Sequence, residues 1–592
     1  MSSLGRQNRP GRNRIPEASY DEASRRRRAQ RTIGAGKYAG PEGSPKVVLY
    51  VFAAFALIVI GKLLWLQVIT APSLKEEAQN SITNVVTVHA KRGTIYDRNG
   101  NVLAMSVDCK DIVADPQQVE KVSETADILV EVLGGDKSEY EEKLSRDSRY
   151  ALIASQVDDS VADELKEKLN EAGLSGMYYN SNTKRVYPYG STGAQIIGHV
   201  NSEGTAQSGL EYYYDEILKG TDGTKIYEAG SGGSPMAGGA SEVNDAQDGT
   251  DIVLSIDIDL QAECETIAAE ATETYASDSS SIMVTNPKTG EIYAACSTPL
   301  PDFDNLTDIS SLNLKLVTDS YEPGSVFKVL TTSIGFDLGL FTPETTYNVP
   351  WSYQVGDDYV TDDDGRDYDE DMTVRYMLLH SSNPAMAMLV QEHIGAKAFS
   401  EGVAKFGIGT KTGIDFPGET SGIVKSYDEY DGSTAGSMAF GQGVAIPMVQ
   451  IVRAYASVAN KGTLTTPHFL ISKGGEEVEW ADGGQTISEE AAEQEIDIMR
   501  SVMTDGTGTN GQVEGYDIAG KTGTGEQADS SGTYGAYNYV ASLCGFANAS
   551  DPEVLVYTGL NGTAHLALSS AANVFHDVME KSVTILGIAP VQ

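Results

Sequence analysis

The longest apolar run in the chain extends from Val47 to Val68 and contains one charged residue, Lys62. A helix of this length rises about 33 Å, which is enough to cross a bilayer. Lys62 and Trp65 lie near one end, where a snorkelling amine and an indole ring suit the membrane interface. The run predicts a transmembrane helix over residues 47–68. A cleaved signal peptide is the alternative, although it usually has a shorter charged leader.

Residues 1–46 form a basic tail with eleven Lys/Arg and four Asp/Glu. The net charge of the tail is therefore +7, and that of the rest of the chain is −48. The tail lacks apolar periodicity, which predicts disorder. Positive charge beside a transmembrane helix predicts a cytoplasmic N-terminus and an extracytoplasmic remainder. A nucleic-acid-binding arm is the alternative for the tail. The strongly negative remainder would repel nucleic acid, so we expect no such partner.

Short strand and helix patterns alternate through residues 69–245. Residues 91–104 predict two strands joined by an Asn-Gly turn. Apolar residues recur at helical spacing over 117–133 and 160–172, and glycine follows each stretch. The glycine-rich segment 230–239 predicts a flexible loop or linker. This region contains no catalytic constellation, and we interpret it as a structural pedestal.

Residues 246–592 predict a second domain that mixes strands and helices. A strand over 251–257 is followed by a helix over 260–275 and a hairpin over 281–296. Helical patterns fill much of 325–460, strands follow at 539–546 and 553–558, and a helix at 571–585 closes the chain. An antiparallel sheet with helices before, between and after it is an α+β fold.

The four cysteines, Cys109, Cys264, Cys296 and Cys544, form no C-x-x-C pair and have no histidine cluster beside them. We therefore expect neither a metal site nor a cofactor. Buried free thiols are the favoured interpretation, and a disulfide is the alternative. The acidic run 357–371 predicts a solvated loop, with a Ca²⁺ site as the alternative.

The strongest chemical signal is the stretch Tyr321-Glu-Pro-Gly-Ser-Val-Phe-Lys328. Pro323-Gly324 break the preceding structure, and an apolar, helix-compatible run follows. Ser325 and Lys328 would share one helix face at the positive end of the helix dipole. A hydroxyl beside an amine and free N–H donors suits an activated serine nucleophile. Ser181 and Lys184 repeat the Ser-x-x-Lys spacing in a polar stretch without helical pattern, so spacing alone is weak evidence.

Two further elements complete a candidate site: Ser381-Ser-Asn383 and Lys521-Thr-Gly-Thr524. The triple Ser-x-x-Lys, Ser-x-Asn and Lys-Thr-Gly is a known signature of serine acylating enzymes. An attack on an amide needs a base, a proton for the leaving amine and an anchor for the substrate. We assign Lys328 as the base, which must be neutral to accept the proton, Ser381 as the relay and Asn383 as the orienting amide. Lys521, with the Thr522 and Thr524 hydroxyls, would bind a carboxylate, and Gly523 would leave room for an extended peptide.

Lys-Thr-Gly also occurs at Lys288 to Gly290 and at Lys411 to Gly413. The first copy precedes Ser325 and lies in a predicted hairpin turn, and the second follows Asn383 closely and leads into a turn. Only the copy at Lys521 follows a strand-like segment. We therefore interpret the other two copies as structural turns.

These motifs together resemble the class B penicillin-binding proteins, typified by the division-specific and sporulation transpeptidases. Further family-like segments are Arg92-Gly93, Asp97-Arg-Asn-Gly100, Phe406 to Glu419 and Phe440-Gly-Gln-Gly443. The resemblance implies a β-lactamase-like domain with a five-stranded antiparallel sheet and helices on both faces. An elongated α+β pedestal or dimerisation domain and one transmembrane helix would precede it. The expected segments are the basic tail at 1–46, the transmembrane helix at 47–68, the pedestal or dimerisation domain at 69–245 and the β-lactamase-like domain at 246–592.

The resemblance implies a peptidoglycan D,D-transpeptidase that cross-links stem peptides through a Ser325 acyl-enzyme and releases D-Ala. β-Lactams would acylate the same serine. Expected partners are peptidoglycan stem peptides, the membrane and cell-wall synthesis proteins such as a glycosyltransferase. Two alternatives stay open: a hydrolase of the same fold, and a non-catalytic scaffold or β-lactam sensor.

Overall fold

The computed structural model describes residues 45–70, 83–228, 241–303, 305–306, 308–362, 365–528 and 534–591. The predicted basic tail, apart from its last two residues, and the whole of the glycine-rich segment 230–239 lie outside these ranges. The chain divides into two units, residues 1–83 and 84–592. The first unit contains helix α1 (Pro45–Leu64), which continues as a π-helical turn, Trp65–Ile69. Among the described residues, one helix, Lys46–Val68, is long and apolar enough to cross a membrane.

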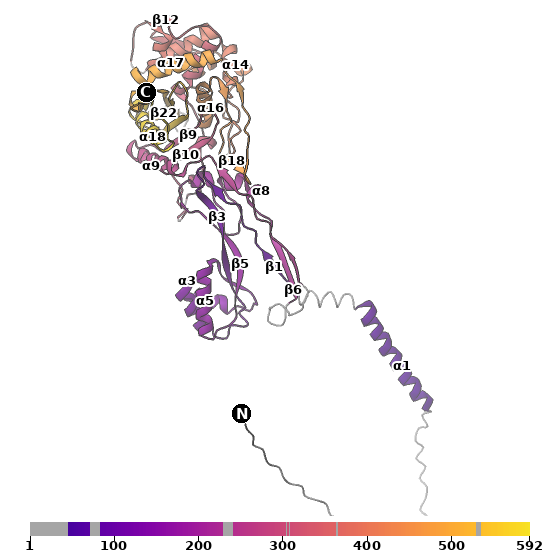
Figure 1. Cartoon of the computed structure of the whole chain (residues 1–592). Helices are drawn as coiled ribbons and strands as arrows, with labels where there is room; N and C mark the ends of the chain where they lie inside the picture. The colour runs from indigo at the N-terminus through magenta and orange to yellow at the C-terminus, as the bar shows by residue number, and fades with distance from the viewer. Residues whose placement is uncertain are drawn as a thin grey trace, which may run out of the picture. The chain divides into compact units, whose positions relative to one another are not determined.

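The second unit begins with strands and helices in which several strands pair with partners far along the chain (Figure 1). Strands β1, β6 and β7 form one sheet, and β2, β3 and β4 belong to a larger sheet in which β5 also pairs with β3. The elements are β1 (Thr83–Val88), β2 (Ile95–Tyr96), β3 (Val102–Ala114), α3 (Val122–Leu133), α4 (Lys137–Leu144), β4 (Ala151–Asp158), α5 (Asp159–Glu171), β5 (Met177–Val186), α6 (Ala194–Ile197), α7 (Gly209–Tyr213), α8 (Asp215–Leu218), β6 (Gly223–Glu228) and β7 (Ser241–Asn244).

A buried ion cluster joins three segments of this region. Arg92 Nε and Arg185 Nε donate to the two carboxylate oxygens of Glu211, at 2.5 and 2.7 Å. Arg92 Nη1 donates to Asp215 at 2.6 Å. The side chain of Glu211 is fully buried, so its charge requires both guanidinium groups. The cluster fixes the start of the second unit against β5 and α7.

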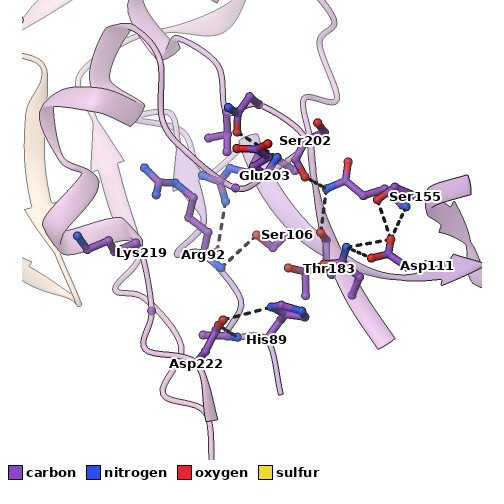
Figure 2. Close-up of a pocket in the computed structure, with 18 residues that line it drawn as sticks. His89, Arg92, Ser106, Asp111, Ser155, Thr183, Ser202, Glu203, Lys219 and Asp222 are labelled. Carbon is purple, nitrogen blue, oxygen red and sulfur yellow. Dashed lines mark hydrogen bonds and ion pairs between the residues drawn. The ribbon is translucent and has the colours of Figure 1, made fainter. Parts of the chain in front are cut away.

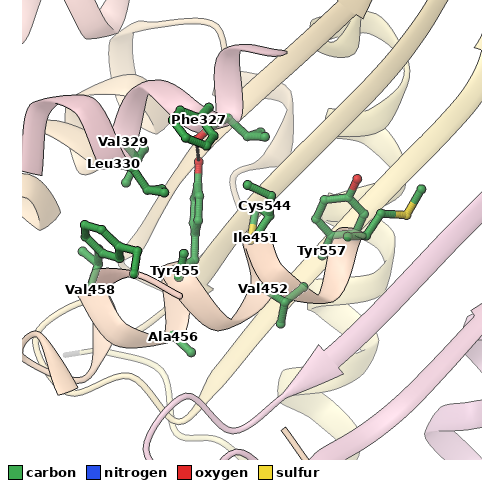
Figure 3. Packing of buried hydrophobic residues seen from close by; sticks show 14 of the residues in the cluster. Phe327, Val329, Leu330, Ile451, Val452, Tyr455, Ala456, Val458, Cys544 and Tyr557 are labelled. Carbon is green, nitrogen blue, oxygen red and sulfur yellow. Dashed lines mark hydrogen bonds between the residues drawn. The ribbon is translucent and has the colours of Figure 1, made fainter. Parts of the chain in front are cut away.

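The five-stranded antiparallel sheet predicted for the second domain is confirmed, with the order β10-β9-β23-β22-β21. Its strands are β9 (Ser279–Thr285), β10 (Ile292–Ser297), β21 (Ile518–Ala528), β22 (Tyr534–Ala547) and β23 (Val554–Thr563). Helices α9 (Ile258–Thr274) and α18 (Ala571–Ile585) share a buried apolar cluster with one face of the sheet. Helix α16 (Met448–Ala459) packs on the other face (Figure 3). Strand β21 lies at an edge, which leaves one of its sides open.

Most of the remaining elements lie on the side of the face covered by α16, whereas η6 and η7 pack against α18. They are η2 (Ile309–Leu312), α10 (Lys315–Thr318), β11 (Ser320–Tyr321), η3 (Gly324–Phe327), α11 (Lys328–Asp337), β12 (Thr346–Val349), β13 (Ser352–Val355), β14 (Asp358–Thr361), β15 (Glu370–Thr373), α12 (Val374–Leu379), α13 (Asn383–Met388), η4 (Leu389–Ile394), α14 (Ala396–Lys405), η5 (Tyr427–Glu429), α15 (Thr434–Met438), β16 (Ile446–Pro447), β17 (Thr463–Leu464), β19 (Glu476–Glu477), β20 (Gly484–Gln485), α17 (Glu489–Asp505), η6 (Thr509–Gly511) and η7 (Ala567–Ser569).

Strand β8 (Ile252–Leu254) links the two parts of the second unit. It pairs in parallel with β2 on one side and antiparallel with β18 (Leu470–Lys473) on the other. The buried Asp415 adds a second link, since it accepts hydrogen bonds from the Tyr214 hydroxyl and from the N–H groups of Phe469 and Leu470. The expected boundary near residue 245 therefore lies just before a strand that pairs with both parts.

All four cysteines are free and buried, which confirms the favoured interpretation of the sequence. Cys264 and Cys296 lie in the cluster between α9 and the sheet, and Cys544 lies on the face covered by α16 (Figure 3). Cys109 lies on β3, where burial raises its pKa to about 11. Burial likewise raises the pKa of the other three thiols.

Candidate active site

Ser325 lies in a 3₁₀ turn, Gly324–Phe327, that continues directly into helix α11. The turn is tight because the Lys328 N–H donates to the Ser325 carbonyl. Ser325 is partly exposed, whereas Lys328 is fully buried one turn later. Tyr455 of α16 supports the turn from below, where its hydroxyl donates to the Val326 carbonyl at 2.7 Å (Figure 3). The sequence prediction that Ser325 begins a helix is therefore correct, with a 3₁₀ first turn.

Gly324 is held between two segments that are distant in sequence. Its N–H donates to the Gly441 carbonyl at 3.0 Å, and a Cβ on Gly324 would lie 2.9 Å from the Cα of Gly525 on β21. Gly324 has φ +57°, and Gly441 has φ +82°. Both positions therefore favour glycine, and the contacts fix Ser325 beside the edge strand.

Replacing Gly441 with alanine should disrupt this clamp. A Cβ at Gly441 would collide with the Gly324 carbonyl oxygen, and alanine is strained at this φ. We expect a loss of about 3 kcal/mol or more in the free energy of unfolding, together with slower acylation. Gly443→Ala is the matched control, because Gly443 has φ +69° but open space around it, with the nearest atom at 3.8 Å. Equal effects of the two substitutions in denaturant unfolding would contradict the clamp.

The Ser381 turn meets the buried amine of Lys328. Lys328 Nζ donates to the Ser381 carbonyl, to Ser381 Oγ at 3.1 Å and to Asn383 Oδ1 at 2.7 Å. Ser381 has φ +59°, which is uncommon for a residue with a side chain. Such strain persists where the surroundings enforce it, and it is concentrated at functional sites. Ser381 and Asn383 thus contact the amine of Lys328, although they follow it in the chain by 53 and 55 residues.

Asp362 holds the Ser381 turn in place, a role that the sequence analysis missed. Its carboxylate accepts from Ser382 Oγ at 2.9 Å, from the Asn383 N–H at 2.8 Å and from Arg366 Nη2 at 3.0 Å. The Asp362 side chain is 8% exposed and that of Arg366 is 3% exposed. The expectation that the acidic run 357–371 is a solvated loop is therefore wrong at Asp362, because an arginine and two donors compensate its burial.

Asp362→Asn should slow acylation of Ser325 by roughly tenfold while leaving initial ligand binding unchanged. The amide replaces one acceptor oxygen by a donor, so it cannot satisfy Ser382, Asn383 and Arg366 together. Stopped-flow acylation by a chromogenic β-lactam separates the two steps. Asp357→Asn, at an exposed residue of the same acidic run, is the control and should be silent.

Lys521 reaches the same hydroxyl from the edge strand. Its Nζ donates to Ser381 Oγ at 3.0 Å and to the Thr522 carbonyl at 2.9 Å, and the side chain is fully buried. Burial and the charge of Lys328 hold the pKa of Lys521 well below its usual range. The Ser381 hydroxyl therefore bridges two amines, of which at least one is driven toward its neutral form. The sequence argument placed the neutral amine at Lys328, and that assignment stays a prediction.

The residues after Lys521 have different surroundings. Thr522 is 5% exposed, and its hydroxyl lies 2.5 Å from that of Thr507, whereas the partly exposed Thr524 accepts the Ala567 N–H at 3.3 Å. A Cβ on Gly523 would lie 2.8 Å from Ser542 Oγ and 2.9 Å from Val326 Cγ1. The absence of a side chain at Gly523 therefore lets β21 pack closely against the turn that carries Ser325. The sequence analysis explained this glycine only by the room it leaves for a peptide.

Comparison with known proteins places this geometry in a family. Residues 280–580 match the penicillin-binding protein transpeptidase domain, and residues 87–254 match the penicillin-binding protein dimerisation domain. The chain is 31% identical over 565 residues to the Neisseria gonorrhoeae protein named "Probable peptidoglycan D,D-transpeptidase PenA", covering 93% of this chain and 94% of that protein. The chain belongs to the class B penicillin-binding proteins.

The chain is also similar to solved structures. One, described as a putative peptidoglycan glycosyltransferase from Atopobium parvulum, is 46% identical, with a TM-score of 0.68, and the match covers 86% of this chain and 100% of that one. Another is penicillin-binding protein 3 of Mycobacterium tuberculosis in complex with aztreonam. It is 25% identical, with a TM-score of 0.66, and covers 86% of this chain and 98% of that one.

The second Ser-x-x-Lys copy and the two other Lys-Thr-Gly copies of this penicillin-binding protein lie on a strand and in turns away from Ser381. Ser181 and Lys184 lie on strand β5, where Ser181 Oγ accepts from Lys110 and Lys184 pairs with Asp158. Lys288 lies in the turn between β9 and β10 and pairs with Asp551 at 2.5 Å. The Thr412 hydroxyl donates to Glu419 at 2.6 Å, which closes a local turn. None of the three copies contacts the cluster around Ser381.

A polar cavity of about 390 Å³ lies in the pedestal region of the penicillin-binding protein (Figure 2). Asp111 accepts from Ser155, Asn182 and the Gln156 N–H, and His89 pairs with Asp222. The polar groups of its wall thus bond largely to one another. No predicted site residue lines this cavity, so we do not connect it with the acylation chemistry. Among the described residues, no group of three His, Cys, Asp or Glu could hold a metal ion.

Proposed function

We propose that Ser325 is the nucleophile through which this penicillin-binding protein forms its acyl-enzyme. The family assignment makes the chain a peptidoglycan D,D-transpeptidase and a β-lactam target. In the proposed reaction, Ser325 Oγ attacks the carbonyl carbon of the penultimate D-Ala of a donor stem peptide. The terminal D-Ala leaves as an amine, and an acceptor amine from a neighbouring stem then takes the acyl group and releases Ser325.

The observation that carries this proposal is the position of Ser381 Oγ between the amines of Lys328 and Lys521, at 3.1 and 3.0 Å. In the proposed mechanism Lys328 accepts the Ser325 proton, and Ser381 passes a proton to the departing amine. Asn383 orients Lys328 through its Oδ1, and Lys521 with Thr522 and Thr524 binds the terminal carboxylate. The N–H group of Ser325 itself, in the η3 turn, would help to stabilise the oxyanion that forms at the attacked carbonyl.

Labelling with a fluorescent penicillin tests the proposal. We expect one covalent adduct per chain, and digestion followed by mass spectrometry should place it on the peptide that contains Ser325. An adduct on another residue would overturn the assignment of the nucleophile. Rapid release of the hydrolysed drug would instead favour a hydrolase of the same fold over a transpeptidase.

We further propose that α1 anchors the chain in the membrane with its N-terminus in the cytoplasm. The support is the apolar helix Lys46–Val68 and the basic residues that precede it. The catalytic part would then act outside the membrane on peptidoglycan, beside a partner that polymerises glycan strands. Accessibility of a tag at each end to an external protease would test the orientation.

The pH dependence of acylation should reflect the lysine pair. Because the pKa of Lys521 is lowered by burial and by the charge of Lys328, the pair loses a proton well below the ordinary lysine value of about 10.4. A neutral amine is needed as the base, so the rate should rise with pH through this lowered pKa and then become constant. Acylation rates measured from neutral to alkaline pH check this. A profile without an inflection below about pH 9 would contradict it.

A further inference from the structure

Glu495 places a carboxyl group in the apolar face of helix α17. Its neighbours on that face, Ala491, Ile498 and Met499, are buried, and the side chain of Glu495 is itself fully buried. Neither of its carboxyl oxygens has a hydrogen-bond partner in the described part of the chain, so no cation pairs with it directly. A buried charge without a partner is strongly unfavourable, and burial raises the pKa of Glu495 well above its usual range. Glu495 is therefore uncharged in the folded protein at neutral pH.

The polar groups that face Glu495 belong to helix α11, which carries the proposed base. They are the hydroxyls of Thr332 and Ser333, and both side chains are fully buried. The Thr332 hydroxyl donates its proton to the Lys328 carbonyl at 3.0 Å, so it can only accept from Glu495. Ser333 Oγ has no partner among the described residues, so its proton can be donated. An uncharged carboxyl offers a donor for Thr332 and an acceptor for Ser333, whereas a carboxylate offers no donor.

The described elements packed against α17 supply no counter-charge for Glu495. Their charged and titratable groups are Lys328 and Asp337 on α11, Lys521 and Glu526 on β21, Arg375 and Tyr376 on α12, and Arg453 and Tyr455 on α16. The two lysine amines bind at Ser381, Arg375 pairs with Asp497 at the surface, and the Tyr455 hydroxyl donates to the main chain of the η3 turn (Figure 3). The hydroxyls of α11 are therefore the partners that remain for Glu495.

We propose that uncharged Glu495 is a positioning residue that holds helix α11, and with it Lys328, in the geometry needed for acylation. The Glu495 hydroxyl donates to Thr332 Oγ1, which donates in turn to the Lys328 carbonyl, and Ser333 donates to the second oxygen of the carboxyl group. Lys328 lies at the start of α11 and its amine contacts Ser381, so a shift of this turn displaces the base from its partners. This inference rests on the proposed function, because it concerns the base of that reaction.

Substitutions of similar size test this chain of hydrogen bonds in the full-length protein. Glu495→Gln keeps a donor and an acceptor and should acylate within about twofold of wild type, whereas Glu495→Met keeps neither and should be about tenfold slower. Thr332→Val removes the link to Lys328 and should be about as slow as Glu495→Met. Stopped-flow acylation by a chromogenic β-lactam, with active-site titration, gives the rate per folded molecule. Glu493→Gln, at an exposed glutamate of the same helix, is the matched control and should be silent.

The double variant Glu495→Met with Thr332→Val separates positioning from lost packing. Because both substitutions break one chain, the double variant should be no more than about twofold slower than either single variant. Losses that multiply, a Glu495→Gln variant as slow as Glu495→Met, or a normal rate in Thr332→Val would overturn the inference. If Glu495→Met does not fold, Thr332→Val and the pH dependence of unfolding decide.

The pH dependence of unfolding tests the uncharged state without relying on acylation. Glu495 keeps its proton in the folded protein and releases it on unfolding above the ordinary glutamate pKa of about 4.3, so rising pH favours the unfolded state. The unfolding equilibrium constant of wild type, divided by that of Glu495→Gln, should rise about tenfold per pH unit between about pH 5 and 7. A ratio independent of pH would mean that Glu495 is charged in the folded protein and would overturn the inference. Failure of penicillin to label Ser325 in wild type would instead refute the proposed function and would leave this measurement unaffected.

Discussion

Replacing Ser325 with alanine should abolish covalent labelling by penicillin and lower transpeptidation by about 10⁶-fold, because no other group can form the acyl bond. The fold should persist. Ser325 is partly exposed, and the contacts that hold its turn are made by the main chain of Gly324 and Val326. Gel fluorescence with a labelled penicillin and a thermal unfolding curve would measure the two properties separately.

Ser181→Ala is the matched control, because it removes the serine of the second Ser-x-x-Lys copy, on strand β5. It should label as strongly as wild type. In a cell that depends on this protein, Ser325→Ala should fail to support growth and Ser181→Ala should succeed. Growth supported by Ser325→Ala would mean that the essential role is that of a scaffold, and the enzymatic proposal would not explain that role.

Replacing Lys328 with methionine should lower the acylation rate by about 10³-fold or more, since it removes the proposed base and a donor to three oxygens around Ser381 and Asn383. Methionine fills the same buried space without a charge, so the free energy of unfolding should change far less than the rate. Stopped-flow acylation by a chromogenic β-lactam, with active-site titration, gives the rate per folded molecule.

Lys184→Met tests whether the loss is specific to the site. Lys184 is the lysine of the second copy and pairs with Asp158 on the pedestal. Its replacement should leave acylation unchanged. If Lys328→Met retained near-normal acylation, another group would have to take the Ser325 proton, and Lys521 would be the next candidate because its pKa is lowered.

The spacing of apolar residues was sufficient to predict the helices and strands in which that spacing is regular. The closing helix is found at Ala571–Ile585 as predicted, and the strand pattern at 539–546 corresponds to the C-terminal part of β22. Helix α9 starts at Ile258, two residues earlier than predicted, because Asp257 caps it by accepting from the N–H groups of Asp259 and Leu260. Helix α3 starts at Val122, five residues later than predicted, because Asp115 accepts from the Gln117 N–H in a preceding turn.

Contacts between distant segments could not be predicted in this way. The motif residues Ser381, Asn383 and Lys521 could be selected by spacing and resemblance, and the structure brings them together around Lys328. Asp362 lies in an acidic run whose composition is typical of a solvent-exposed loop, and Thr507 lies in no motif. Each acquires its partners only when strands and turns converge in three dimensions, so single-sequence periodicity contains no signal for them.

The burial of all four cysteines makes the folded chain well suited to site-specific spectroscopy. Their raised pKa values keep the thiols protonated, and burial shields them from reagents, so a maleimide dye should leave the native protein unmodified. A single cysteine introduced at an exposed position, such as Thr509, would then be the dominant labelling site. Distance measurements between dyes on two such introduced cysteines could follow the loop beside β21 during acylation without removing any natural cysteine.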